Sequence, residues 1–504
     1  MPSSEAERDP PTKVPDLVVG IDFGMTGTAV AFAAPVDQTV TVLRNWPGTH
    51  LHQDKVPSII AYQDSTPSSW GFDVNLQEMP KAPGIKSFFK GVFDEQDLRQ
   101  ANQDTSLNIA IDEVERWLTD YLRQLYGHIK NSLKARLPLG TEWETAKIRF
   151  LFSYPTTWSK ETIQRFKKVI EQAGFRGSDE PSSGPHEIEA TLNEAEAAMA
   201  YYFAESKLPK AEDHLMIADI GGGTSDVSIF LVKGYEGMSP KLSLRVAGQG
   251  LNTGSTKIDE GFETALRGRL RSLLPQLKLE GADEATITTT IELLTWKMVQ
   301  DSGFLDAKCR YGDKPGGTLT KPYFYVPVPT LDASFSDQTL EVENGRMIFY
   351  RDKLFKQLFD DECAKIWGQF TSQIEECFPG SDSSRLEKVK LHVILTGGMG
   401  SSQYVKDFLV KKFRAKYATV PQFAVAEEPQ LAVCKGLVHD ALKEINQGGL
   451  FRYAAQAWYG IAKNNSFQSV EWFLKKDEEL GLSASRDVKR LLDMDGEGGW
   501  RCRL

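Results

Sequence analysis

LVVGIDFGMTGTAVAF, at residues 17–32, is the segment from which the architecture can be worked out. An apolar, β-branched run leads into a turn that contains Gly24 and Gly27, and a second apolar run follows the turn. Buried strands have this composition, and two strands joined by a glycine turn form a hairpin. We therefore predict a β-hairpin with Asp22 at the end of its first strand.

The same pattern returns at residues 215–230, which read LMIADIGGGTSDVSIF. Aligning Asp22 with Asp219 also aligns Gly24 with Gly221. One such hairpin can be an ordinary tight strand turn. Two of them, each closing a buried strand, favour a duplicated fold with two lobes that face each other.

A third glycine segment, LHVILTGGMGSS at residues 391–402, predicts a strand, a turn and then a helix. Helical patterns elsewhere alternate with strands, and this alternation is typical of an α/β fold. We expect a flexible arm (1–15), lobe I (16–205, with an insertion at about 52–130), lobe II (206–445, with an insertion at about 260–345) and a C-terminal region (446–504). Helices are expected at 111–136, 161–173, 189–203, 352–377 and 428–445, the last returning to the lobe interface.

Composition excludes several classes of protein. The 504 residues carry a net charge of −10 without a dense Lys/Arg run, which gives no support for binding nucleic acid. No run of 18 uncharged apolar residues predicts a membrane span, and the polar N-terminus does not resemble a secretory signal. Five cysteines without a C-x-x-C pair and seven scattered histidines argue against disulfide and zinc frameworks. We expect a cytoplasmic or nuclear monomer.

The two glycine hairpins are suited to binding phosphate groups. Successive backbone N–H groups in such a turn form a concave nest for anions, and glycine allows a phosphate to come close. An aspartate beside a phosphate makes sense if a divalent cation stands between them, and Mg²⁺ is typically held by one or two carboxylates together with substrate phosphates. Asp22 and Asp219 would flank such an ion.

These three segments resemble the phosphate-1, phosphate-2 and adenosine motifs of the actin-like ATPase superfamily. Within it the chain is similar to the DnaK-type heat-shock chaperones, and most of all to their divergent "heat-shock protein 12" group with its fungal relatives. The resemblance covers about residues 16–445. Further segments agree in the same order: KVPSII (55–60), YPTTW (154–158), LNEAEAA (192–198), GSTKID (254–259) and EPQLAVCKG (428–436).

The resemblance implies a two-lobed actin-like ATPase fold, with duplicated ribonuclease-H-like domains and ATP or ADP with Mg²⁺ bound between the lobes. Asp22 and Asp219 would hold the magnesium ion through its water shell. The phosphates would be bound by Gly24, Thr26, Gly27, Gly221, Gly222, Gly223 and Thr224. The adenosine side would be bordered by Gly397, Gly398 and Ser401, and Gly254 and Ser255 would belong to the nucleotide-binding set.

Catalysis in this family is mostly placement and charge stabilisation. The resemblance implies that Glu194 positions water or metal and that Asp226 orients the second hairpin or the attacking water. The lysine that neutralises the γ-phosphate is either Lys86 or Lys90, and the Phe-Phe-Lys context favours Lys90. In lobe II, Lys297 is the candidate to face the nucleotide.

The chain also departs from the family pattern. Met25 stands where the chaperones carry the first of two threonines, and a thioether cannot donate a hydrogen bond to a γ-phosphate. Slow hydrolysis is therefore expected. The chaperones' arginine that stacks on adenine has no clear counterpart in residues 399–402.

Three functions remain open. The first is an ATP-binding, weakly hydrolysing chaperone-like protein. The second, motivated by Met25, is a non-hydrolysing nucleotide-sensing scaffold, and the third is a small-molecule kinase of the same fold, for which no acceptor site is marked. A chaperone's β-sandwich takes about 100 residues, so residues 446–504 are expected to form only an incomplete substrate-binding region, without ATP-sensitive client binding.

Overall fold

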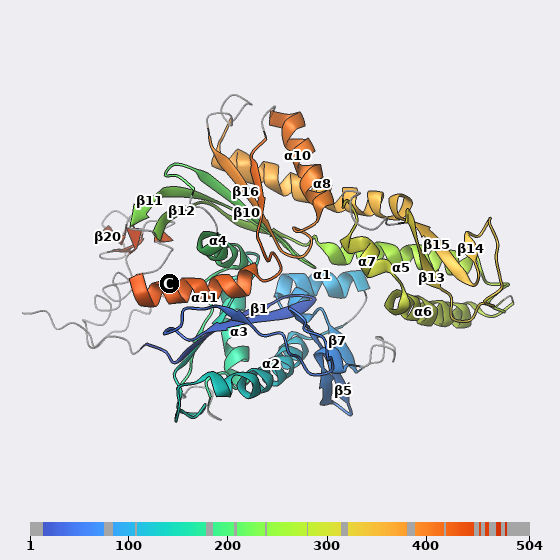
Figure 1. Ribbon diagram of the computed structural model, residues 1–504, viewed down its shortest axis with the longest axis horizontal. Helices are drawn as coiled ribbons and strands as arrows, with labels where there is room; N and C mark the ends of the chain where they lie inside the picture. Colours follow the sequence, from blue (N-terminus) through green and yellow to red (C-terminus); the bar gives the residue numbers. More distant parts are fainter. Residues whose placement is uncertain are drawn as a thin grey trace, which may run out of the picture.

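The computed structural model of the chain is an α/β protein (Figure 1). The N-terminal arm expected at 1–15 lies almost entirely outside the residues that the structure describes. Those residues are 14–74, 84–105, 108–177, 185–205, 209–236, 239–279, 281–313, 321–380, 389–417 and 420–447, with four short strands between 453 and 480.

A first mixed sheet contains the hairpin predicted from residues 17–32. Its strands are β1 (Leu17–Phe23), β2 (Gly27–Ala33), β3 (Thr41–Val42), β4 (Val56–Pro57), β8 (Ile148–Phe152) and β9 (Glu187–Glu189). The strand order is β3-β2-β1-β8-β9, and β4 also pairs with β2. β1 is antiparallel to β2, and β8 is parallel to both β1 and β9. All seven residues of β1 are buried, as expected for a central strand.

A second sheet repeats this plan. Its strands are β10 (His214–Ile220), β11 (Ser225–Glu236), β12 (Ser239–Leu251), β16 (Leu391–Thr396) and β17 (Gln422–Val425). The order β12-β11-β10-β16-β17 matches the first sheet strand for strand. The strand directions match as well, because β10 is antiparallel to β11 and parallel to β16. The predicted duplication is therefore present in the topology.

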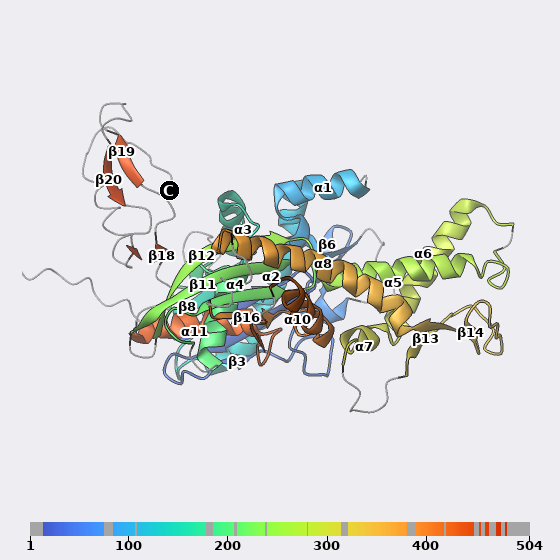
Figure 2. The same ribbon diagram turned by 90° about the horizontal axis from the view of Figure 1, so that it is seen from above.

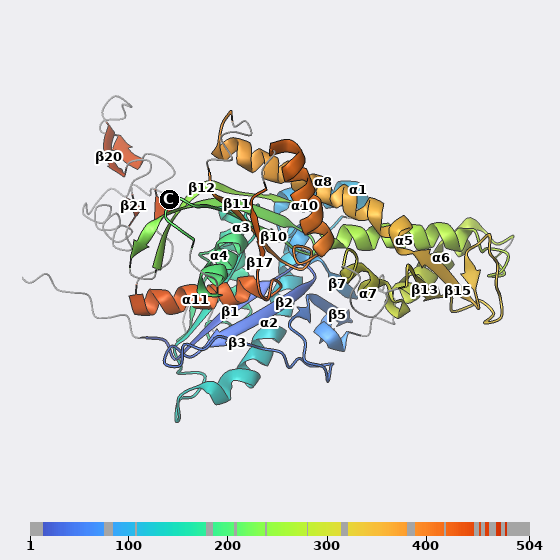
Figure 3. The ribbon, with the colours of Figure 1, turned by 45° about the horizontal axis from the view of Figure 1, so that its top comes forward.

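Two helices, α4 (Glu194–Glu205) and α11 (Ala432–Gln447), lie between the sheets (Figures 1 and 3). They share one buried cluster with side chains from both sheets, including Val18 of β1 and Ile217 of β10. Their axes approach closely at Gly436, where a Cβ atom would overlap the carbonyl oxygen of Ala197. α11 therefore returns to the space between the sheets, as predicted for residues 428–445.

The outer faces of the sheets are covered by other helices. On the first sheet, α2 (Ile111–Leu133) and α3 (Lys160–Gln172) pack onto an aromatic-rich core. The outer face of the second sheet is covered by α5 (Ser255–Arg271), α8 (Arg351–Cys377) and α10 (Gln403–Tyr417). α4 begins at residue 194 rather than 189, because Asn193 and Glu196 form reciprocal side-chain-to-backbone caps at 2.9 and 3.0 Å.

Two smaller units flank the sheets. One contains β5 (Ile59–Gln63), β6 (Thr66–Trp70), β7 (Ile85–Ser87), the short helices η1 (Gly71–Asp73) and η2 (Phe89–Val92), and α1 (Glu95–Thr105). The other projects along the long axis of the molecule (Figure 2). It contains the outer part of α5 with α6 (Glu284–Asp301), α7 (Phe304–Cys309), β13 (Tyr323–Pro327), β14 (Val342–Glu343) and β15 (Arg346–Tyr350).

Beyond α11, the structure describes only two antiparallel strand pairs. These are β18 (Tyr453–Ala454) with β21 (Glu479–Leu480), and β19 (Tyr459–Ala462) with β20 (Val470–Leu474). The rest of the expected substrate-binding region lies outside the described residues. Within the described ranges, no helix combines the length and the apolar character needed to cross a membrane.

Candidate functional site

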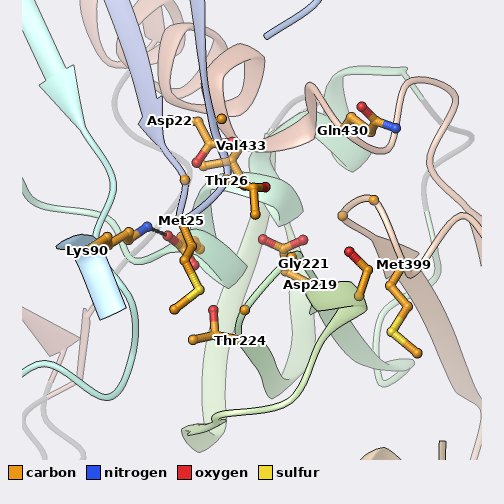
Figure 4. Close-up of a pocket in the computed structure, with 18 of the residues that line it drawn as sticks. Asp22, Met25, Thr26, Lys90, Asp219, Gly221, Thr224, Met399, Gln430 and Val433 are labelled. Carbon is orange, nitrogen blue, oxygen red and sulfur yellow. Dashed lines mark hydrogen bonds and ion pairs between the residues drawn. The ribbon is translucent and has the colours of Figure 1, made fainter. Parts of the chain in front are cut away.

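A cavity of about 320 Å³ lies where the two glycine hairpins meet (Figure 4). This volume is at the lower end of the range for small-molecule sites. Most of the residues predicted from the sequence line it. They are Asp22, Gly24, Met25, Thr26, Gly27, Lys90, Glu194, Asp219, Gly221, Gly222, Gly223, Thr224, Ser255, Gly397, Gly398 and Ser401.

The first hairpin is held by a buried chain of hydroxyl groups. Ser58 donates from Oγ to the carbonyl oxygen of Gly24 at 2.8 Å, and its Oγ lies 3.0 Å from Thr28 Oγ1. Tyr121 donates to the same Thr28 oxygen at 2.8 Å. Because each of these hydroxyl groups has a buried partner, the turn has little freedom to change shape.

The second hairpin is held by the start of α5. The backbone N–H groups of Ser255 and Thr256 donate to the carbonyl oxygens of Gly221 and Gly222 at 3.2 and 2.8 Å. Gly254 packs so closely on this turn that a Cβ atom would overlap the Gly222 carbonyl, but it does not line the cavity. The structure therefore gives Gly254 a structural role instead of the predicted role in binding. It allows α5 to pack against the hairpin.

The two turns face each other directly. A Cβ atom on Gly222 would lie 2.8 Å from Thr26 Oγ1. The side chain of Met25 reaches from the first hairpin toward the second (Figure 4). A Cβ atom on Gly223 would overlap Met25 Sδ, and one on Gly91 would overlap Met25 Cε. Met25 therefore fills the space between these two glycines.

Lys90 forms a buried ion pair with Glu194 in the cavity. Both side chains are less than a tenth exposed. Burial raises the pKa of Glu194, and the neighbouring Asp226 and Asp22 add to this effect, whereas Lys90 opposes it. Lys86 lies elsewhere, with its ammonium 4.6 Å from the centre of the Trp117 ring. Of the two candidate lysines, the structure brings Lys90 to the cavity.

Asp219 extends from the end of β10, where Thr396 donates to its carboxylate at 3.2 Å. Burial raises the pKa of Asp219 to about 8, and repulsion by Glu194 and Asp22 contributes.

Asp226 lies outside the cavity. Its carboxylate accepts hydrogen bonds from the backbone N–H, at 3.1 Å, and the hydroxyl of Thr156. Asp226 therefore ties the second hairpin to the segment after β8.

The raised pKa of Asp219 predicts a pH-dependent stability. The folded chain retains this proton up to about pH 8, whereas the unfolded chain loses it near pH 3.8, so the free energy of unfolding falls as the pH rises between these values. Asp219→Asn removes this effect. We expect its stability advantage over the wild type to grow between pH 5 and pH 8.5 by at least about 1.4 kcal/mol, the value of one pKa unit.

Chemical denaturation at the two pH values measures this difference. Asp283→Asn is the control, because Asp283 is an exposed helix cap whose pKa is lowered by hydrogen bonds from Thr286. Its difference from the wild type should not grow over the same pH interval. A gain for Asp219→Asn that is equal at both pH values would contradict the assignment.

Asp22 has a partner that the sequence analysis missed. Lys55 Nζ lies 2.7 Å from Asp22 Oδ2, and both residues line the cavity. The fit of a magnesium ion is therefore poor, because one of its two expected carboxylates is already paired with an ammonium group. Among the described residues, no group of three or more His, Cys, Asp or Glu side chains is arranged to hold a metal ion.

The prediction for Lys297 is not supported by its position. Lys297 is exposed on α6, whose buried side carries Ile291, Leu294 and Met298, and it is not among the cavity residues. Lys308, from the same part of the chain, lines the cavity instead, and it pairs with Asp259 at 2.5 Å.

Other cavity residues also escaped the sequence analysis. They include Lys55, Asp97, Asn252, Lys308, Phe359 and Gln430. Lys55 is the first residue of KVPSII (55–60) and Gln430 lies in EPQLAVCKG (428–436), so the resemblance had marked both neighbourhoods without marking these side chains. Asp97, Asn252, Lys308 and Phe359 lie outside the segments that the resemblance marks.

The chain matches no model of a known protein family, and no curated protein matches it.

Proposed function

We propose that this chain is an ATP-binding protein of the actin-like fold, with the nucleotide between two ribonuclease-H-like lobes. One observation carries the proposal. Two sheets of identical strand order each present an Asp-x-Gly hairpin at the same point, and the two hairpins face one cavity. A single Asp-x-Gly turn has many uses, but a matched pair facing one cavity suits a ligand with several phosphates.

In this proposal the phosphates bind to the hairpins. Backbone N–H groups at Gly24–Gly27 and Gly222–Thr224 would form the anion nests, and the ammonium groups of Lys55 and Lys90 would supply positive charge. The adenosine would lie toward Gly397 and Ser401, where Phe359, Met399 and Gln430 also line the cavity. The magnesium ion predicted from the sequence is not part of this proposal, because Asp22 is already paired with Lys55.

Hydrolysis would depend on groups that place a water molecule. Glu194 is held by Lys90, and Asp219 is held by Thr396, so both carboxyl groups have defined positions. Met25 opposes turnover in two ways: it offers no hydroxyl group, and its side chain fills the space between Gly91 and Gly223. We therefore propose weak ATP hydrolysis in a chaperone-like protein. The filling by Met25 also favours the second candidate, a nucleotide-sensing scaffold that does not hydrolyse ATP.

Replacing Met25 by threonine tests both candidates. We expect single-turnover hydrolysis of ATP to accelerate at least tenfold in Met25→Thr, which corresponds to about 1.4 kcal/mol of barrier. Bound nucleotide is quantified in parallel by isothermal titration calorimetry. Met25→Ala separates the two causes, because it removes the bulk without adding a hydroxyl group.

The outcomes divide the candidates clearly. Absence of ATP binding at millimolar nucleotide would reject the proposed function. Binding without turnover in the wild type and in Met25→Thr would support the scaffold. Acceleration in Met25→Thr alone would assign the effect to the hydroxyl group, and equal acceleration in Met25→Ala would assign it to the bulk of the methionine.

A further inference from the structure

Lys55 places a fixed positive charge beside Asp22 inside the cavity. The Nζ–Oδ2 distance is 2.7 Å, and 27% of the lysine side chain is exposed, against 8% for Asp22. Lys55 lines the cavity, so part of its side chain is accessible from there, whereas the side chain of Asp22 is almost completely covered.

The backbone determines where this lysine lies. Lys55 directly precedes β4, which pairs with β2 so that Gly27 lies opposite Pro57. A Cβ atom on Gly27 would lie 3.3 Å from Lys55 Cβ and 3.7 Å from Lys55 Cδ. The glycine thus leaves room for the lysine stem to run along the first hairpin toward Asp22.

Lys55 and Asp22 form an ion pair that a metal ion at this position would have to disturb. A divalent cation between Asp22 and Asp219 would have to displace this ammonium group or lie next to it. Both arrangements cost free energy, because like charges repel and Asp22 would lose its partner.

We propose that the Lys55 ammonium group takes the place of a divalent cation, so that the cavity binds the phosphates of ATP without Mg²⁺. This inference rests on the proposed function. Lys55 neutralises Asp22 and presents the remaining face of its ammonium group to the phosphates, while the hairpin N–H groups bind the same oxygens. The consequence is an affinity for free ATP close to that for Mg-ATP.

Calorimetric titration with ATP tests this in buffer with excess MgCl₂ and in excess EDTA without metal. For the wild type, we expect the two dissociation constants to agree within about fivefold. Lys55→Met keeps the stem and removes the charge, so it should lose at least about tenfold in affinity for free ATP, or 1.4 kcal/mol. Lys55→Arg should retain binding in EDTA. Lys86→Met is the matched control, because Lys86 lies outside the cavity.

A wild-type affinity that falls more than fivefold in EDTA would overturn the inference while leaving ATP binding established. Absence of binding in both buffers would reject the proposed function and this inference with it. The wild-type comparison decides even if Lys55→Met does not fold. A variant Lys55→Met that binds free ATP as tightly as the wild type would also overturn the role of the ammonium group.

Discussion

Gly436→Ala is expected to destabilise the fold strongly, because α11 and α4 are in backbone contact at this residue. Gly436 lies where α11 crosses α4, and its Cβ position would overlap the carbonyl oxygen of Ala197 and lie 3.1 Å from the backbone nitrogen of Tyr201. The obstacle is backbone, so no side chain can rotate away. The helices would have to separate, and both sheets pack on them.

We expect a loss of about 3 kcal/mol or more in the free energy of unfolding, at the upper end of the cost of overpacking a core. Urea denaturation measures it. Gly368→Ala is the control, because Gly368 lies in the interior of α8 and, apart from its chain neighbours and the backbone of its own helix, nothing lies within 4 Å of its Cβ position. That variant should gain about 0.5–1 kcal/mol from helix propensity. Similar values for the two variants would show that the helices are not in close contact at Gly436.

The second large effect concerns the buried ion pair of Lys90 and Glu194. Lys90→Met leaves the Glu194 carboxylate buried without its partner, and losses of about 3–5 kcal/mol are typical for such a change. The loss should be larger at pH 8 than at pH 5. Burial and neighbouring carboxylates already raise the pKa of Glu194, and without Lys90 it rises further, so at pH 5 the group takes up a proton and the penalty shrinks.

A double-mutant cycle isolates the pair. Glu194→Gln in the Lys90→Met background removes the unpaired charge and should restore most of the lost stability at pH 8. Lys86→Met, which removes only an ammonium group near the Trp117 ring, should cost no more than about 1 kcal/mol. A loss in Lys90→Met that is the same at both pH values, with no recovery in the double variant, would mean that the cost comes from lost packing alone.

Both effects depend on long-range contacts, and this shows where the sequence stops being informative. The hairpin at residues 17–32 could be predicted because its signals, an apolar run and a glycine turn, are local. The Ala-rich pattern at residues 189–203 predicts a helix that begins five residues before α4, at the last residue of β9. The prediction is wrong there, although the Asn193–Glu196 cap that sets the start of α4 is also local.

The side-chain pairs in the cavity could not be predicted from local signals, because their members lie far apart in the sequence. Lys55 lies 33 residues from Asp22 along the chain, and Lys90 lies 104 residues from Glu194. The sequence offers two candidate lysines, Lys86 and Lys90, and only the Phe-Phe-Lys context favours Lys90. Their positions differ because Lys86 is in β7, against Trp117, whereas Lys90 is in η2, which faces the first hairpin.

By itself, the sequence determined that this is an α/β chain with two matched Asp-x-Gly hairpins, because strand and turn preferences act over a few residues. Only the tertiary structure decided which charges meet. The packing of two sheets on α4 and α11 brings the hairpins together, places Met25 between Gly91 and Gly223, and pairs Asp22 with Lys55. Such contacts join residues far apart in the chain, so they depend on how whole elements pack and not on local pattern.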